Sequence, residues 1–100
     1  MPNPDLIDQP ESMHDVRENV DAIDRALVDL LVQRFAMMDA AARIKPDRGA
    51  VRDEARKAEV IENAASYAAG LGLPSDIIAA LWDQLVESSI AYEFDRFDER

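Results

Sequence analysis

Two basic residues, Arg34 and Lys45, are placed where the sequence predicts an apolar helical face. Arg34 interrupts an apolar stripe with heptad-like spacing, which comprises Val16, Val20, Ile23, Leu27, Leu30, Met37 and Ala41. A guanidinium on such a seam is costly to bury unless an anionic group meets it. The 11-residue separation between Arg34 and Lys45 turns a helix by about 1100°, so both lie on nearly the same face, roughly 16 Å apart. Because small alanines lie between them, the pair predicts a site for a compact dianion.

A second polar interruption occurs in the last helical segment. Ser89 breaks an apolar stripe formed by Ile78, Leu81, Trp82, Leu85 and Tyr92. Glu93 lies one turn after Ser89 on nearly the same face, so both side chains are candidates for the same site. In the alternative interpretation, Ser89 bonds back to the Leu85 carbonyl and Glu93 is a solvated acid near the helix end.

The usual groups of nucleophilic and metal chemistry are missing. The chain has no Cys, and its one histidine, His14, has no evident partner to orient it as a base, so neither a Ser-His-Asp system nor a transition-metal site is expected. Asp53 and Glu54 face apart on a helix, which argues against a magnesium site. Positioning and electrostatics would have to drive any reaction, without metal or cofactor. A unimolecular rearrangement or elimination of a dianion fits that description.

Three helices would position these residues, and the expected fold class is all-α. Residues 1–11 are expected to be a flexible tail and residues 12–97 a helical domain. Ser12 and Asp15 resemble a capping box at the start of the first helix, which Pro46 should end near residue 44. At more than 30 residues, this helix would be roughly 48 Å long. A helix of that length with an apolar seam predicts pairing with a second chain.

The remaining elements follow after a short loop, PDRGA (46–50). The second helix is expected from 51 to 69, with Gly70 as its C-cap. The third helix is expected from 76 to 97, with Ser75 as its N-cap.

Composition limits the possible partners. The net charge of −10 makes nucleic acid and anionic membranes poor partners. Six of the 11 Lys and Arg residues nevertheless fall within positions 43–57, either as ordinary surface cations or as a local site for a small acid. The absence of Cys fits a reducing cytoplasm, and the N-terminus has no signal-peptide pattern. No apolar run approaches membrane-spanning length.

The chain resembles the all-helical chorismate mutases from about residue 13 to residue 94. The resemblance rests on DVRENVDAIDRALVDLLVQR (15–34), AARIK (41–45), VRDEAR (51–56) and LWDQLVESSIAYE (81–93). The family spaces two arginines and a lysine as Arg17, Arg34 and Lys45 are spaced here. By itself, Arg17 would be read as a surface partner of Asp21.

This resemblance implies an intertwined homodimer of three-helix subunits that converts chorismate to prephenate by a Claisen rearrangement. Arg17, donated by the partner chain, and Arg34 would hold the two substrate carboxylates. Lys45 would reach a carboxylate and the ether oxygen of the breaking bond. Glu93 would donate a hydrogen bond to that oxygen, and Ser89 would help to hold the ring carboxylate.

Two further residues, Asp53 and Arg56, would lie near the ring hydroxyl, and two positions depart from the family pattern. Lys57 stands where a glutamate often receives that hydroxyl, which leaves hydroxyl recognition open. Glu93 stands where glutamine is frequent, and an ionised carboxylate only accepts hydrogen bonds. It would have to be protonated to act as a donor, a form that burial and nearby anions favour.

Two alternatives remain at this point. One is an isochorismate-pyruvate lyase on the same fold, which would form salicylate. The other is a non-enzymatic helical dimerisation module, whose seam would leave Arg34, Lys45 and Ser89 unexplained. The family also includes mutases that a companion shikimate-pathway enzyme activates, so an activating partner is an open expectation, as is a role for DRFDER (95–100).

Overall fold

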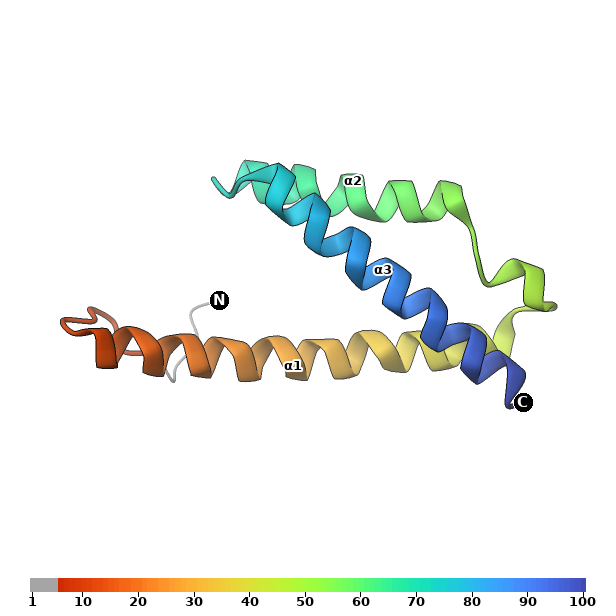
Figure 1. Ribbon diagram of the computed structural model, residues 1–100, viewed down its shortest axis with the longest axis horizontal. Coiled ribbons are helices and arrows are strands. Elements are labelled where there is room, and N and C mark those ends of the chain that lie inside the picture. Colours follow the sequence, from red (N-terminus) through yellow and green to blue (C-terminus); the bar gives the residue numbers. More distant parts are fainter. Residues whose placement is uncertain (1–5) are drawn as a thin grey trace. The chain divides into compact units, whose positions relative to one another are not determined.

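The described residues, 6–100 of a computed structural model, are helical with no strand. The elements are α1 (Met13–Ile44), a short 3₁₀ helix η1 (Arg48–Ala50), α2 (Glu54–Gly70) and α3 (Ser75–Asp98) (Figure 1). The prediction of an all-α chain with three helices and a long first one is confirmed. Contacts divide the chain into two compact units, residues up to Ala36 and residues from Met37 onward. Each unit is described by itself.

The first unit contains most of α1 and the segment that leads into it. The Asp15 amide donates to Ser12 Oγ at 3.1 Å, so Ser12 caps the helix as predicted. The Asp15 carboxylate accepts from the Glu11 amide at 3.1 Å, one residue earlier than a capping box requires. Asn19 accepts from the Ile7 amide at 2.7 Å and donates to the Ile7 carbonyl at 2.9 Å. Residues 1–5 of the expected tail lie outside the described residues.

The predicted apolar seam of this unit is largely open to solvent within the single chain. Its exposed members include Val20, Ile23, Leu27 and Leu30. Leu27 and Leu30 are 51% and 58% exposed. Leaving several large aliphatic side chains exposed on one face is unfavourable, and such faces mark interaction surfaces.

In the second unit, α2 and α3 form a hairpin of contacting helices (Figure 1). The predicted start of the second helix at residue 51 is wrong by three residues. Asp53 is the N-cap, and its carboxylate accepts from the Arg56 amide at 3.0 Å. Val51 instead ends η1 and is 4% exposed, because it belongs to the core rather than to a helical turn.

The turn between α2 and α3 corrects two further predictions. Gly70 is the last residue of α2, and Gly72 is the glycine with positive φ, 85°. The Gly72 amide bonds to the Ala69 carbonyl and the Leu73 amide to the Ala68 carbonyl, which is a Schellman motif with Gly72 at the left-handed position. Ser75 is the first residue of α3 rather than its cap, since the N-cap is Pro74, which has no side-chain donor or acceptor.

The core of the second unit is small. It consists of Val51, Val86 and Ile90, with Val60, Ile61, Phe94 and Phe97 packed against it. The buried face of α3 therefore runs along Val86, Ser89, Ile90 and Glu93, whereas Leu81 of the expected stripe is 57% exposed. None of the helices within residues 6–100 combines the length and apolarity needed to cross a bilayer.

Candidate functional site

The end of α1 brings Lys45 to Glu93 of α3. The Lys45 amide still donates to the Ala41 carbonyl at 2.9 Å, so helical spacing persists to Lys45 before Pro46 ends it. Lys45 Nζ donates to Glu93 Oε2 at 2.7 Å and to the Val51 carbonyl at 3.4 Å. The Glu93 side chain is 5% exposed and that of Lys45 is 28% exposed. The ammonium is thus fixed on one side and accessible on another.

Ser89 lies one turn before Glu93 on the buried face of α3. Ser89 is 3% exposed, and its Oγ donates to the Leu85 carbonyl at 2.7 Å. This is the bond that the structural interpretation of Ser89 predicted. The interpretation of Glu93 as a solvated acid is wrong, because Glu93 is 4% exposed and paired with Lys45.

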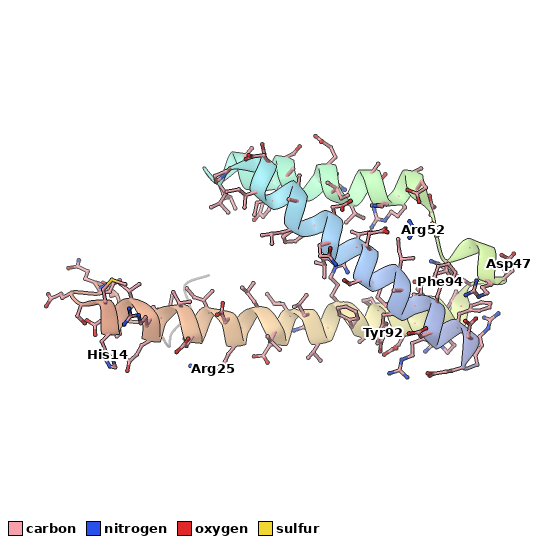
Figure 2. The ribbon with its side chains drawn as sticks, viewed as in Figure 1. His14, Arg25, Asp47, Arg52, Tyr92 and Phe94 are labelled. Atoms are coloured by element: carbon pink, nitrogen blue, oxygen red, sulfur yellow. The ribbon has the colours of Figure 1, made fainter. Side chains whose placement is uncertain are left out.

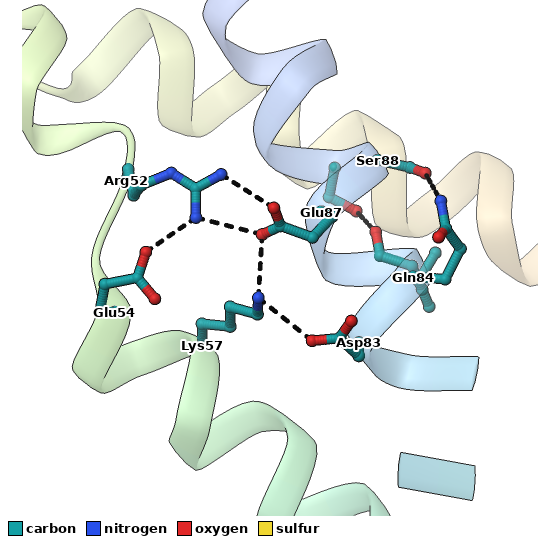
Figure 3. A network of polar contacts seen from close by, with 9 residues as sticks. Arg52, Glu54, Lys57, Asp83, Gln84, Glu87 and Ser88 are labelled. Atoms are coloured by element: carbon teal, nitrogen blue, oxygen red, sulfur yellow. Dashed lines mark hydrogen bonds and ion pairs between the residues drawn. The ribbon is translucent and has the colours of Figure 1, made fainter. Parts of the chain in front are cut away.

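A second charged cluster joins α2 to α3 on the surface (Figure 3). Arg52 forms a two-pronged contact with Glu87, with both nitrogen–oxygen distances at 3.1 Å. Lys57 Nζ lies 3.1 Å from both Glu87 and Asp83. Hydrogen bonds from Arg52 and Lys57 lower the pKa of Glu87 to about 2, and hydrogen bonds to Glu87 and Asp83 raise the pKa of Lys57. The Lys57 ammonium is therefore paired with two neighbouring acids.

The end of α3 is tied to the end of α1 and to η1 by further polar contacts. Tyr92 donates to Asp39 at 2.7 Å, and Arg96 donates to the Tyr92 oxygen at 3.0 Å. Arg48 pairs with Asp98 at 2.9 Å and lies 4.5 Å from the centre of the Phe94 ring; Figure 2 shows Phe94 beside the η1 segment. These contacts fix the polypeptide on both sides of Lys45.

Comparison with known proteins identifies the family of this chain. The sequence model of the type II chorismate mutase family matches residues 16–94. The chain belongs to this family. The matched span contains Arg17, Arg34, Lys45, Ser89 and Glu93. The chain is also 31% identical over 77 residues to an isochorismate pyruvate lyase of Pseudomonas aeruginosa, a match that covers 77% of this chain and 76% of the relative. Family membership places the chain among enzymes built on this helical fold.

Two other residues of the predicted chorismate site, Asp53 and Arg56, make local contacts at the start of α2. Asp53 caps α2, and Arg56, with a 62% exposed side chain, pairs with Glu59. Both side chains therefore have local roles here. Arg17 and Arg34 belong to the first unit, in which Arg17 is exposed and Arg34 half-buried.

The prediction for His14 can also be compared with the structure. His14, predicted to be a surface residue, lies 3.1 Å from Glu18 with an 80% exposed side chain. No group of three or more His, Asp or Glu side chains within residues 6–100 is arranged to hold a metal ion.

Sequence reasoning missed the partners of Lys57. Asp83 and Glu87 are four residues apart and thus share one face of α3. That spacing was a usable signal, because Arg52 and Lys57 supply the opposite charge at the start of α2. Where the family often has a glutamate, this chain therefore has Lys57, and α3 carries the two acids that pair with it.

Proposed function

We propose that this protein is a chorismate mutase that rearranges chorismate to prephenate without a cofactor. The observation that carries the proposal is the Lys45–Glu93 contact of 2.7 Å, with Glu93 buried on α3. A buried acid next to a half-exposed ammonium is expensive to maintain for stability alone. In the family pattern, Lys45 stands at the position of the lysine and Glu93 at the position of the residue that bonds to the ether oxygen. This match supports a catalytic role for the pair.

In the proposed mechanism, Lys45 stabilises negative charge that develops on the ether oxygen as the C–O bond breaks. Two of the three ammonium donors are directed at Glu93 and at the Val51 carbonyl, so the third remains for a substrate oxygen. Arg34 and Arg17 bind the two carboxylates and hold the compact conformer in which the new C–C bond can form. Substrate binding would bring anionic groups beside Glu93, which in its protonated form donates to the ether oxygen.

The site requires a homodimer in this proposal, with Arg17 donated by the partner chain. The exposed aliphatic side chains of α1, such as Leu27 at 51% and Leu30 at 58%, support a second copy as the partner of that face. A mixing experiment tests the donation. If Arg17→Ala and Lys45→Ala chains are refolded together, each mixed dimer holds one intact site, and random pairing restores about a quarter of wild-type activity. If Arg17 serves its own chain, the mixture stays inactive.

A second candidate is an isochorismate-pyruvate lyase, favoured by the 31% identity to the Pseudomonas aeruginosa enzyme. Both reactions break a C–O bond at the ether oxygen of a dianion, the mutase by rearrangement and the lyase by elimination of pyruvate, so Lys45 keeps its role. The ring substituents differ, so the reactions are distinguished by substrate.

Separate incubations with chorismate and isochorismate decide between the two activities. A mutase forms prephenate from chorismate, whereas a lyase forms salicylate and pyruvate from isochorismate. The proposal fails if purified dimer gives no prephenate above the uncatalysed rate. Arg25→Ala is a matched control, because Arg25 is an exposed residue on α1 with no assigned role. If a companion shikimate-pathway enzyme activates this protein, adding that enzyme to the assay should raise the rate of prephenate formation. A cytoplasmic location is also part of the proposal.

A further inference from the structure

The helix end that carries Lys45 has an acceptor without its normal helical donor. In an α-helix, the carbonyl of Ala42 would accept from the amide at position 46. Position 46 is Pro46, which has no amide hydrogen. Ala42 is 2% exposed, so water has little access to this region of the chain. A buried carbonyl without a donor is costly, and another group must donate to it.

Arg100 supplies that donor from the other end of the unit. Its Nη1 donates to the Ala42 carbonyl at 3.3 Å and to the Lys45 carbonyl at 2.7 Å. Longer contacts reach the carbonyls of Arg43, at 3.5 Å, and Pro46, at 3.4 Å. A planar guanidinium can serve several acceptors at once, and a positive charge at a helix C-terminus is favourable.

The Arg100 guanidinium is itself held in place. It lies 3.7 Å from the centre of the Phe97 ring, a distance at which a cation and an aromatic face attract. Phe97 in turn packs against the core of Val51, Val86 and Ile90. A continuous set of contacts therefore leads from the core, through Phe97 and Arg100, to the backbone of Lys45.

We propose that Arg100 is a positioning residue for Lys45, an inference that rests on the proposed function. Arg100 fixes the Lys45 carbonyl while Glu93 holds its Nζ, so α3 and its C-terminal extension restrain both ends of the lysine. Restraint of a catalytic group reduces the reorganisation needed to reach the transition state, and misplacement by about 1 Å can cost about 100-fold in rate.

Kinetics of Arg100 variants test this role. Arg100→Ala is expected to lower kcat by about 10-fold with a smaller effect on KM, because in this proposal Arg100 acts through Lys45 rather than on the substrate. Arg100→Lys keeps the charge at the helix end but loses the planar fork, and it should recover part of the rate. Glu99→Gln is the control, because the Glu99 side chain is 63% exposed and pairs with the nearby Arg96; its rate should match wild type.

A double-mutant cycle separates positioning from general stability. In a Lys45→Ala background, Arg100→Ala should change the residual rate by less than about two-fold, since the group that it positions is gone. An equal loss in both backgrounds, or wild-type kcat for Arg100→Ala, would overturn the inference.

Hydrogen exchange keeps the test independent of the proposed function. The Lys45 amide is bonded to the Ala41 carbonyl and the Val51 amide to the Arg48 carbonyl. Exchange of both amides should accelerate in Arg100→Ala but not in Glu99→Gln. If the wild-type protein converts neither chorismate nor isochorismate, the proposed function fails. If exchange of these amides is unchanged in Arg100→Ala, Arg100 does not restrain Lys45 and the inference fails.

Discussion

Two charged clusters of the second unit use similar residues in opposite ways. Lys45 meets one acid, Glu93, whose side chain is 5% exposed. Lys57 meets two acids, Asp83 and Glu87, whose side chains are 57% and 38% exposed. The two lysine side chains are similarly covered, at 28% exposed for Lys45 and 19% for Lys57, so the clusters differ in their acids. The acid of the first cluster is buried on α3, whereas those of the second are open to solvent. These two are the only lysines in the chain, so their environments alone distinguish a candidate catalytic amine from a structural one.

The largest difference between the two lysines should appear in turnover. Lys45→Ala should lower kcat/KM for chorismate by about 100-fold or more, because charge on the ether oxygen loses its stabilising donor. Unfolding free energy should also fall by about 1–3 kcal/mol, since Glu93 loses its buried partner. Steady-state kinetics and denaturant titration measure both effects.

Arg43→Ala is the control for that experiment. Arg43 is an exposed cation two residues from Lys45 and has no assigned role. A Lys45→Ala enzyme with wild-type turnover would remove the distinction between the clusters.

The next effect concerns the acid of the first cluster. If protonated Glu93 donates to the ether oxygen, turnover should fall as pH rises, because an ionised carboxylate cannot donate. Glu93→Gln carries a permanent donor and should flatten the profile of kcat against pH. A profile with the same slope in the variant would exclude this role, and Glu62→Gln, an exposed acid on α2, should leave the slope unchanged.

The smallest effect is expected in the second cluster and concerns stability. The pKa of Glu87 is lowered to about 2 from an ordinary value of 4.5. A depressed pKa in the folded state means that ionised Glu87 stabilises the protein above about pH 4.5 and that this contribution is lost as pH falls toward 2. Wild type should therefore be slightly more stable than Glu87→Gln at pH 7, and the difference should vanish near pH 2.

Thermal unfolding across this pH range measures that difference, and kcat at neutral pH provides the contrast. Glu87→Gln should keep wild-type turnover, because the Arg52–Glu87 contact is a surface link in this interpretation. A loss of turnover comparable to that of Lys45→Ala would place both clusters in one site.

Helical spacing and proline placement were enough to predict the three helices and the end of α1. The start of α2 was misplaced because Val51 is apolar and fits a helical period, while its burial depends on packing against Val86 and Ile90. Gly70 and Gly72 are equally good caps by residue type, and only the chain path selects Gly72. Such choices depend on contacts between distant segments, which local patterns do not contain.

The candidate site likewise combines contacts that the sequence predicted with a contact that it did not. The proximity of Lys45 and Glu93 was implied by the family resemblance, and the contact is present. The bond of Ser89 to Leu85 was foreseen from local geometry, because it needs only one helical turn. The contact of Arg100 with the end of α1 had no local signal, since it joins residues 55 apart in sequence.

Pro46 also bears on the order in which the protein folds. Because Pro46 removes a local donor, the turn after α1 depends on Arg100, and the Lys45 side chain depends on Glu93, 48 residues away. Such contacts close a long loop, and the entropy of closure must be paid before the contacts stabilise the chain, whereas a single helix needs only local contacts. We therefore expect the segment around Lys45 to become ordered late in folding, after the hairpin of α2 and α3. Pulsed hydrogen exchange during refolding would show this as late protection of the Lys45 amide, and protection as early as that of α2 would contradict it.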